Sequence, residues 1–159
     1  MSKLSIYLGD HYAGSVAAVQ LARRAAQSNQ GTPYGEELAT LATEIEEDRQ
    51  ALRLIMQRRG IRPDPAKAAL AWSAEKLGRL KLNGQLTGYS PLSRLEELEI
   101  LSLGVEGKLG MWRALERALD PGVPEADLDT LIKRALSQRQ RLERQRLDAA
   151  SEALSPAST

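Results

Sequence analysis

Short Gly- and Pro-rich segments divide this sequence into stretches that have the composition and periodicity of α-helices. The segments NQGTPYG, RRGIRPDP, NGQLTGYSP and DPGVPEAD contain residues that commonly end one helix and begin the next. Strong helix formers, mainly Leu, Ala, Arg, Glu and Gln, fill the stretches between them. The spacing predicts helices at 3–28, 36–59, 65–82, 92–119 and 124–154.

The overall composition also favours an all-α fold. Phe is absent and aromatic residues make up only 4% of the chain, whereas β-sheet proteins usually depend on aromatic and β-branched residues. A chain of 159 residues is long enough to bury a single core. We therefore expect one helical-bundle domain at 1–154 and a flexible tail at 155–159.

The predicted helix 65–82 differs from the other four because its apolar stripe is thin. The stripe consists of Leu70, Leu77 and Leu80. We interpret this segment as a shorter crossover helix that lies on a bundle of the four longer helices. Four-helix bundles with one long crossover connection are a recognised variant of this architecture.

Charge, cysteine content and hydropathy exclude several functional classes. The formal net charge of +1 provides no global attraction for nucleic acids or anionic membranes. The absence of Cys excludes disulfides, iron–sulfur clusters and thiolate metal sites. No apolar run approaches the roughly 18 residues that a membrane span requires. We therefore expect a cytoplasmic protein.

Charged residues lie on or beside the apolar faces of three predicted helices. They are Glu44 and Asp48 on 36–59, Glu99 and Glu106 on 92–119, and Arg139 and Arg146 on 124–154. Buried single charges are costly, but carboxylates and guanidinium groups can form bidentate pairs. We predict that these six residues form one buried charge network. In two alternatives, the glutamates form a solvated strip, or the arginine stems cover apolar surface while their heads reach water.

Opposite charges are concentrated on two of the predicted helices. The segment 36–48 contains six acidic residues and no basic residue, whereas the segment 133–146 contains six basic residues and one acidic residue. This complementarity predicts that helix 36–59 lies near helix 124–154. Such a network can fix helix register even where desolvation offsets its contribution to stability.

The arrangement resembles the ferritin-like superfamily, most of all its stress-associated bacterial members. The resemblance rests on YLGDHYAGSVAAVQLARR in the first helix, LATEIEEDRQAL in the second and LEELEILSLGVEGKLGMWRAL in the fourth, with a crossover segment and a final helix. It implies a ferritin-like four-helix bundle. In members with a dimetal centre, two helices each supply a carboxylate and the other two each supply a Glu-x-x-His motif.

This chain departs from that ligand pattern. It contains one His and no Glu-x-x-His; Glu44 is followed at i+3 by Glu47. The best alternative ligand set for two iron or manganese ions is His11, Glu44, Glu47, Glu99 and Glu106. Because the final helix carries Arg139 and Arg146 where relatives place acids, we expect a bundle without metal. His11, which lies on an apolar face, is either a satisfied core residue or a ligand.

These patterns predict a non-catalytic interaction or scaffold protein. Helix 92–119 has a second apolar face with Gly104, Gly107 and Gly110, which would admit either the crossover helix or a second subunit of a homodimer. One alternative is a carboxylate-bridged dimetal oxidoreductase or ferroxidase. Another is nucleic-acid binding through the arginines of helix 124–154, although these surround the helix and no aromatic residues lie between them.

Overall fold

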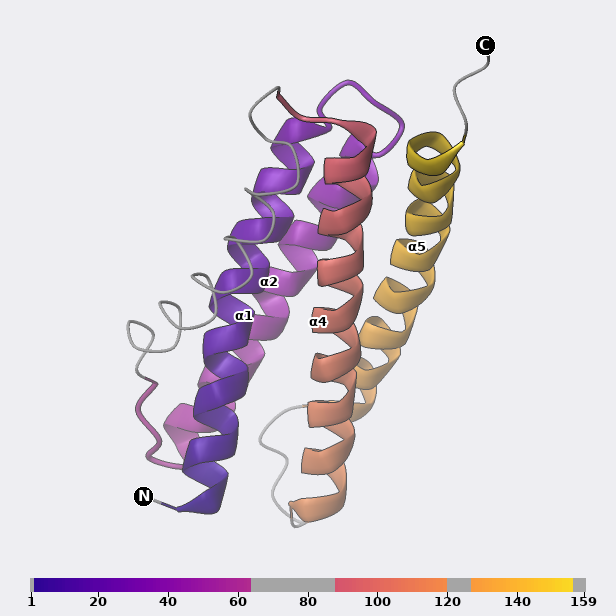
Figure 1. Cartoon of the computed structure of the whole chain (residues 1–159). Helices are drawn as coiled ribbons and strands as arrows, with labels where there is room; N and C mark the ends of the chain where they lie inside the picture. Colours follow the sequence, from indigo (N-terminus) through magenta and orange to yellow (C-terminus); the bar gives the residue numbers. More distant parts are fainter. Residues whose placement is uncertain (1, 64–87, 120–126, 156–159) are drawn as a thin grey trace.

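The computed structural model describes residues 2–63, 88–119 and 127–155. This part of the chain forms four long helices and contains no strand (Figure 1). They are α1 (Lys3–Ser28), α2 (Gly35–Arg58), α4 (Pro91–Ala118) and α5 (Leu128–Leu154). The predicted all-α helical bundle is therefore confirmed, whereas the predicted crossover helix 65–82 lies outside the described residues.

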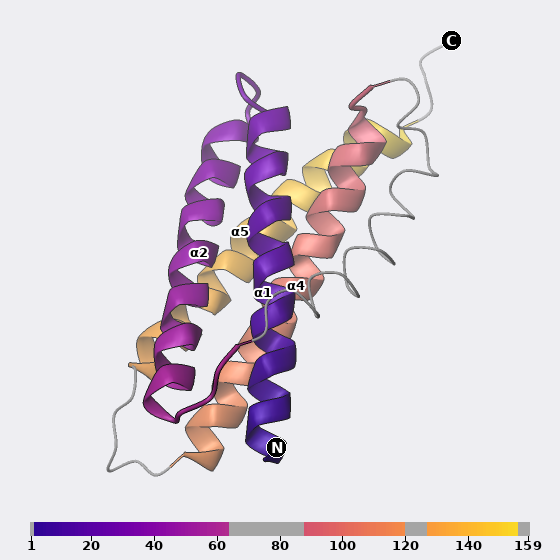
Figure 2. The ribbon, with the colours of Figure 1, turned by 90° about the vertical axis from the view of Figure 1, so that its left-hand side faces the viewer.

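The helices are arranged as two antiparallel pairs. α1 and α2 form one pair, and α4 and α5 form the other (Figure 1). α2 ends and α4 begins at opposite ends of the bundle, so these two helices run in the same direction. Turned by 90°, the α4–α5 pair is tilted relative to the α1–α2 pair (Figure 2).

Side-chain caps and turn residues set the helix boundaries. Ser2 and Asp127 accept hydrogen bonds from backbone N–H groups in the first turns of α1 and α5. Ser90 and Ser93 form a reciprocal capping box at the start of α4. At the α1–α2 turn, a Cβ on Gly35 would lie 2.6 Å from the carbonyl oxygen of Asn29, so glycine permits this close approach.

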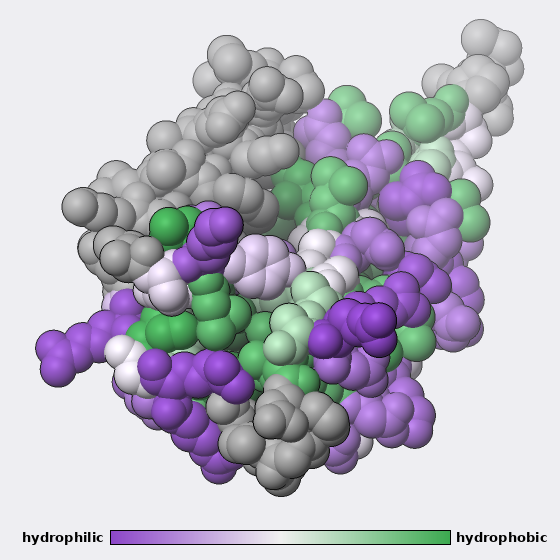
Figure 3. Space-filling model, turned by 90° about the horizontal axis from the view of Figure 1, so that it is seen from below, coloured by the Kyte–Doolittle hydropathy of each residue, from purple (hydrophilic) through white to green (hydrophobic). Residues whose placement is uncertain are grey.

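All four helices contribute apolar residues to the core, and on α2 and α4 these residues recur at steps of three and four. In α4 the buried residues include Leu95, Leu98, Leu101, Val105, Leu109 and Trp112. In α2 they include Leu38, Leu41, Ile45, Leu52 and Met56. This periodicity gives each helix an apolar stripe that packs into the bundle. Seen along the bundle, hydrophobic residues at the centre are bordered by hydrophilic ones (Figure 3).

The helices are long but not uniformly apolar. Among the described residues, none of the helices combines the length and hydropathy needed to cross a membrane.

Candidate functional site

The middle of the bundle contains a layer of polar residues in place of apolar ones. Asp48, Lys108 and Gln138 continue the three-and-four spacing of buried residues on α2, α4 and α5, respectively. Asp48 is 1% exposed and Gln138 is fully buried. Each of these three helices therefore places one polar side chain on or beside its apolar stripe in the middle of the bundle.

These three residues and Arg134 form the central cluster. Lys108 Nζ donates hydrogen bonds to Asp48 Oδ2 and Gln138 Oε1, each at 2.5 Å. Arg134 Nε donates to Asp48 Oδ1 at 2.7 Å, and Gln138 Nε2 donates to Asp48 Oδ2 at 3.1 Å. The buried carboxylate of Asp48 thus accepts from two cations and an amide, which together compensate for its loss of water.

Burial changes the proton affinity of the lysine in this cluster. Removal from water lowers the pKa of Lys108 from its ordinary value, and the nearby charge of Asp48 partly opposes that effect. The ammonium group keeps a third N–H, since Lys has three donors and two are used by Asp48 and Gln138.

A wider ring of ion pairs joins the central cluster to the surface between α2 and α5. Arg141 donates to Glu37 at 2.8 Å and also to Glu44, while Arg134 donates to Glu47 at 2.7 Å. Gln138 Nε2 also donates to Glu44 at 3.1 Å. Long side chains therefore link α2 and α5, which are the two helices whose sequences carry opposite charge.

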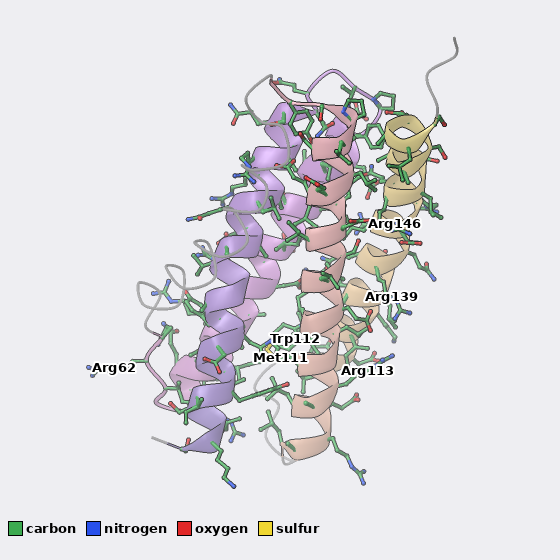
Figure 4. The ribbon with its side chains drawn as sticks, in the orientation of Figure 1. Arg62, Met111, Trp112, Arg113, Arg139 and Arg146 are labelled. Atoms are coloured by element: carbon green, nitrogen blue, oxygen red, sulfur yellow. The ribbon has the colours of Figure 1, made fainter. Side chains whose placement is uncertain are left out.

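The prediction of one buried network of six residues requires correction. Glu44 and Asp48 take part in the interior network, but Glu99, Glu106 and Arg139 are exposed and Arg146 is only partly buried. Arg139 pairs with Glu106 at 3.3 Å, and Arg146 lies 3.6 Å from Glu99. Both arginines lie at the boundary between α4 and α5 (Figure 4).

The phase of α5 explains this correction. Ala135, Leu142 and Ala149 are fully buried and mark the centre of its inner face, and Gln138 lies on the α2 side of that line. Arg139 and Arg146 lie on the opposite flank, from which their long side chains reach the acids of α4. The arginines that reach the interior network are Arg134 and Arg141.

The alternative metal ligands do not come together. Glu44 is engaged by Arg141 and Gln138, while Glu47 is engaged by Arg134. Glu99 and Glu106 face α5, whereas His11 lies between α1 and α4. Within residues 2–63, 88–119 and 127–155, no group of three or more His, Cys, Asp or Glu side chains is placed to hold a metal ion.

A cavity of about 380 Å³ lies beside the central cluster, and we call it the α1–α4 groove. Its lining includes His11, Gly14 and Ser15 from α1, and Gly107, Lys108 and Trp112 from α4. Trp112 projects from the side of α4 that faces α1 and α2 (Figure 4). Burial lowers the pKa of His11 despite the opposing charge of Asp10, so this imidazole is neutral at pH 7.

A second polar cluster lies at the end of the bundle where α1 and α5 finish and α2 and α4 begin. Glu97, which is 1% exposed, pairs with Arg24 at 3.2 Å and accepts a hydrogen bond from Tyr89 at 3.0 Å. Asn29 donates to the Tyr89 hydroxyl at 2.7 Å and accepts from Arg94 at 2.6 Å. Burial is the main cause that raises the pKa of Glu97, and it raises the pKa of Tyr89 to about 12.

Four of the five arginines considered for nucleic-acid binding are engaged with carboxylates. They are Arg134, Arg139, Arg141 and Arg146, and Arg144 is the fifth. Their charges are thus partly neutralised within the protein, which weakens the nucleic-acid alternative.

The interior site predicted from the sequence does not include Lys108, Gln138, Arg134 or Arg141. A usable signal exists for Gln138, which interrupts a stripe of buried apolar residues spaced three and four apart on α5. Lys108 lies beside the unbroken apolar stripe of α4, so its signal is weaker. No comparable pattern marks the two arginines, because their stems begin outside the stripe and reach the cluster through their length.

Comparison with known proteins identifies no family for this chain. It matches no protein-family model, no curated protein and no solved structure.

Proposed function

We propose that this chain is a metal-free, ferritin-like helical bundle that acts as a non-catalytic binding or scaffold protein. The observation that carries the proposal is the position of Lys108, whose ammonium group lies among Asp48 and Gln138 in the middle of the bundle. A fixed cation at this position supplies the positive charge that a bound metal would otherwise provide to the interior carboxylate.

The surrounding ion pairs support the same proposal. Glu44 and Asp48 are the interior acids closest to the ligand pattern of a dimetal bundle, and both accept hydrogen bonds from protein cations. A divalent ion would have to displace these donors and would be repelled by three fixed positive charges, those of Lys108, Arg134 and Arg141.

The direction of the helices supports the ferritin-like part of the proposal. α2 and α4 run in the same direction, and α2 ends at the end of the bundle opposite to the one where α4 begins (Figure 1). Ferritin-like bundles contain such a pair of successive parallel helices, because one of their connections is a long crossover. The homodimer expected from the sequence remains a prediction.

The α1–α4 groove supports a binding role. Leu103, at the edge of the groove, is 69% exposed. Gly104 and Gly107 lie beside it and carry no side chain that would fill the groove. A concave apolar surface with few polar groups is the usual form of a small-molecule or protein binding site.

Elemental analysis of the purified protein tests the metal-free proposal. The chain is produced in medium supplemented with iron and manganese, and its metal content is measured by mass spectrometry. We expect far less than one ion per chain, because the interior acids are already paired. A dimetal ferritin purified in parallel verifies that the medium supplies metal. A ratio close to two ions per chain, retained through gel filtration, would refute the proposal.

A further inference from the structure

The α1–α4 groove contains a buried hydrogen-bond donor for which the described part of the chain supplies no partner. Trp112 is fully buried, it lines the groove, and its indole Nε1 is without a hydrogen-bond partner among the described residues. Buried polar groups are almost always satisfied, and an unsatisfied donor costs about 1–3 kcal/mol. The unpartnered donor therefore points to a hydrogen-bond acceptor in the groove that the described residues do not supply.

A second donor lies one helical turn away on the same face of α4. Lys108 and Trp112 are four residues apart, so their side chains leave the helix as neighbours. Lys108 has an N–H beyond those used by Asp48 and Gln138, and its side chain also lines the groove. These two groups of α4 are donors, so they match an acceptor oxygen, and the lysine charge favours an anionic one. Asp10, His11 and Ser15 line the α1 side of the groove, so the acceptor is expected on the α4 side.

The rest of the groove fits an apolar molecule. Ile45, Leu52, Leu101 and Val105 contribute to its lining, and a cavity of about 380 Å³ falls within the range that holds small organic ligands. Gly107 leaves open space, since a Cβ at this position would meet no described atom within 4 Å.

We propose that the α1–α4 groove binds a small apolar molecule that carries an acceptor oxygen, and that this oxygen accepts a hydrogen bond from Trp112 Nε1. The inference rests on the proposed binding function and specifies its ligand class. The apolar part of the ligand lies against the leucine and valine side chains, and its oxygen points toward Trp112 and Lys108. The neutral imidazole of His11 lies on the opposite wall.

Titration calorimetry with two probes of equal chain length tests this proposal. Decanoate carries acceptor oxygens and a negative charge, whereas decylammonium carries only donors and a positive charge. With both probes below their micelle concentrations, we expect saturable binding of decanoate and at least about tenfold weaker binding of decylammonium. Equal binding of the two probes, or no binding of decanoate, overturns the proposal.

Two substitutions on α4 form a matched pair that places the binding in the groove. Gly107→Leu fills the groove, whereas Gly110→Leu places the same side chain on the exposed surface of the same helix, outside the lining. We expect Gly107→Leu to weaken decanoate binding at least about tenfold, and Gly110→Leu to change it less than about twofold. Equal effects of the two substitutions contradict a site in the groove.

Trp112→Phe tests the hydrogen bond itself. It retains an aromatic ring but removes the N–H donor, and we expect decanoate affinity to fall about tenfold, the effect of one hydrogen bond. Circular dichroism verifies that each variant is folded, and Gly107→Leu remains informative if Trp112→Phe does not fold. Unchanged affinity in folded Trp112→Phe excludes this donor. The metal content of the protein is measured independently of ligand binding. A negative result in these binding experiments is therefore distinguishable from a negative result for the metal-free proposal.

Discussion

Glu97 of α4 has a buried carboxylate, whereas Glu99 and Glu106 on the same helix are exposed. Its hydrogen bonds from Tyr89 and Arg24 favour the charged form, but burial dominates and raises its pKa above the ordinary value of 4.5. The folded state therefore binds a proton at Glu97 more tightly than the unfolded state does.

This linkage predicts how Glu97 affects stability as the pH changes. The stabilising contribution of Glu97 to the folded state is fully present below about pH 4.5. It is lost as the pH rises through the higher pKa that Glu97 has in the folded state. We expect the free energy of unfolding of Glu97→Gln, measured in urea relative to the natural chain, to increase between pH 4.5 and pH 7. The variant therefore becomes relatively more stable as the pH rises.

Glu46 provides a control of opposite sign. Burial alone would raise its pKa, but hydrogen bonds from Arg49 and Gln50, together with the charges of Arg49 and Arg23, outweigh burial and lower it. The contribution of Glu46 to the free energy of unfolding is present above about pH 4.5 and is lost as the pH falls. The free energy of unfolding of Glu46→Gln, relative to the natural chain, should therefore decrease as the pH rises. Parallel pH profiles for the two variants would show that the assigned shift at Glu97 is incorrect.

At the scale of the secondary-structure element, α5 carries arginines on two flanks with different surroundings. Arg141 faces α2, is 17% exposed and contacts Glu37 and Glu44. Arg139 faces α4, is 45% exposed and contacts Glu106, which is also exposed. The two residues thus compare a largely buried ion pair with a solvated one on the same helix.

We expect Arg141→Gln to lower the free energy of unfolding by about 2 kcal/mol, because two carboxylates lose a shielded charged donor. Arg139→Gln should cost less than about 1 kcal/mol, as is usual for an exposed pair. Urea unfolding at low and high salt measures both effects, and salt should reduce only the smaller one appreciably. Equal costs would show that the two flanks are not energetically distinct.

The helices themselves could be predicted from the sequence more closely than the side chains that meet between them. The predicted segment 3–28 agrees with α1 in both bounds, and those of α2 and α4 differ by one residue, because caps, glycines and prolines act locally. The face of α5 was misassigned because Arg139 and Gln138 are adjacent and either fits an apolar stripe. Only packing against α2 and α4 determines which of them is buried.

At the level of the whole molecule, the polar layer lies in the middle of the bundle, between two clusters of buried apolar residues. Asp48, Lys108 and Gln138 come from three different helices and meet only when those helices adopt one register. In coiled coils, a single polar residue at a core position specifies register and partner at some cost in stability. We infer that this layer plays the same part in the bundle and makes its interior a fixed framework for the groove.

In the function proposed above, Lys108 serves as the interior cation of this bundle through its pairing with Asp48. A double-mutant cycle of Lys108→Met and Asp48→Asn, measured by urea unfolding at pH 7, tests it most directly. We predict that Lys108→Met alone costs about 3 kcal/mol, because it leaves part of a buried charge unpaired. The coupling energy between the two sites should favour the natural pair by about 2 kcal/mol. A coupling energy below about 0.5 kcal/mol would contradict the claim.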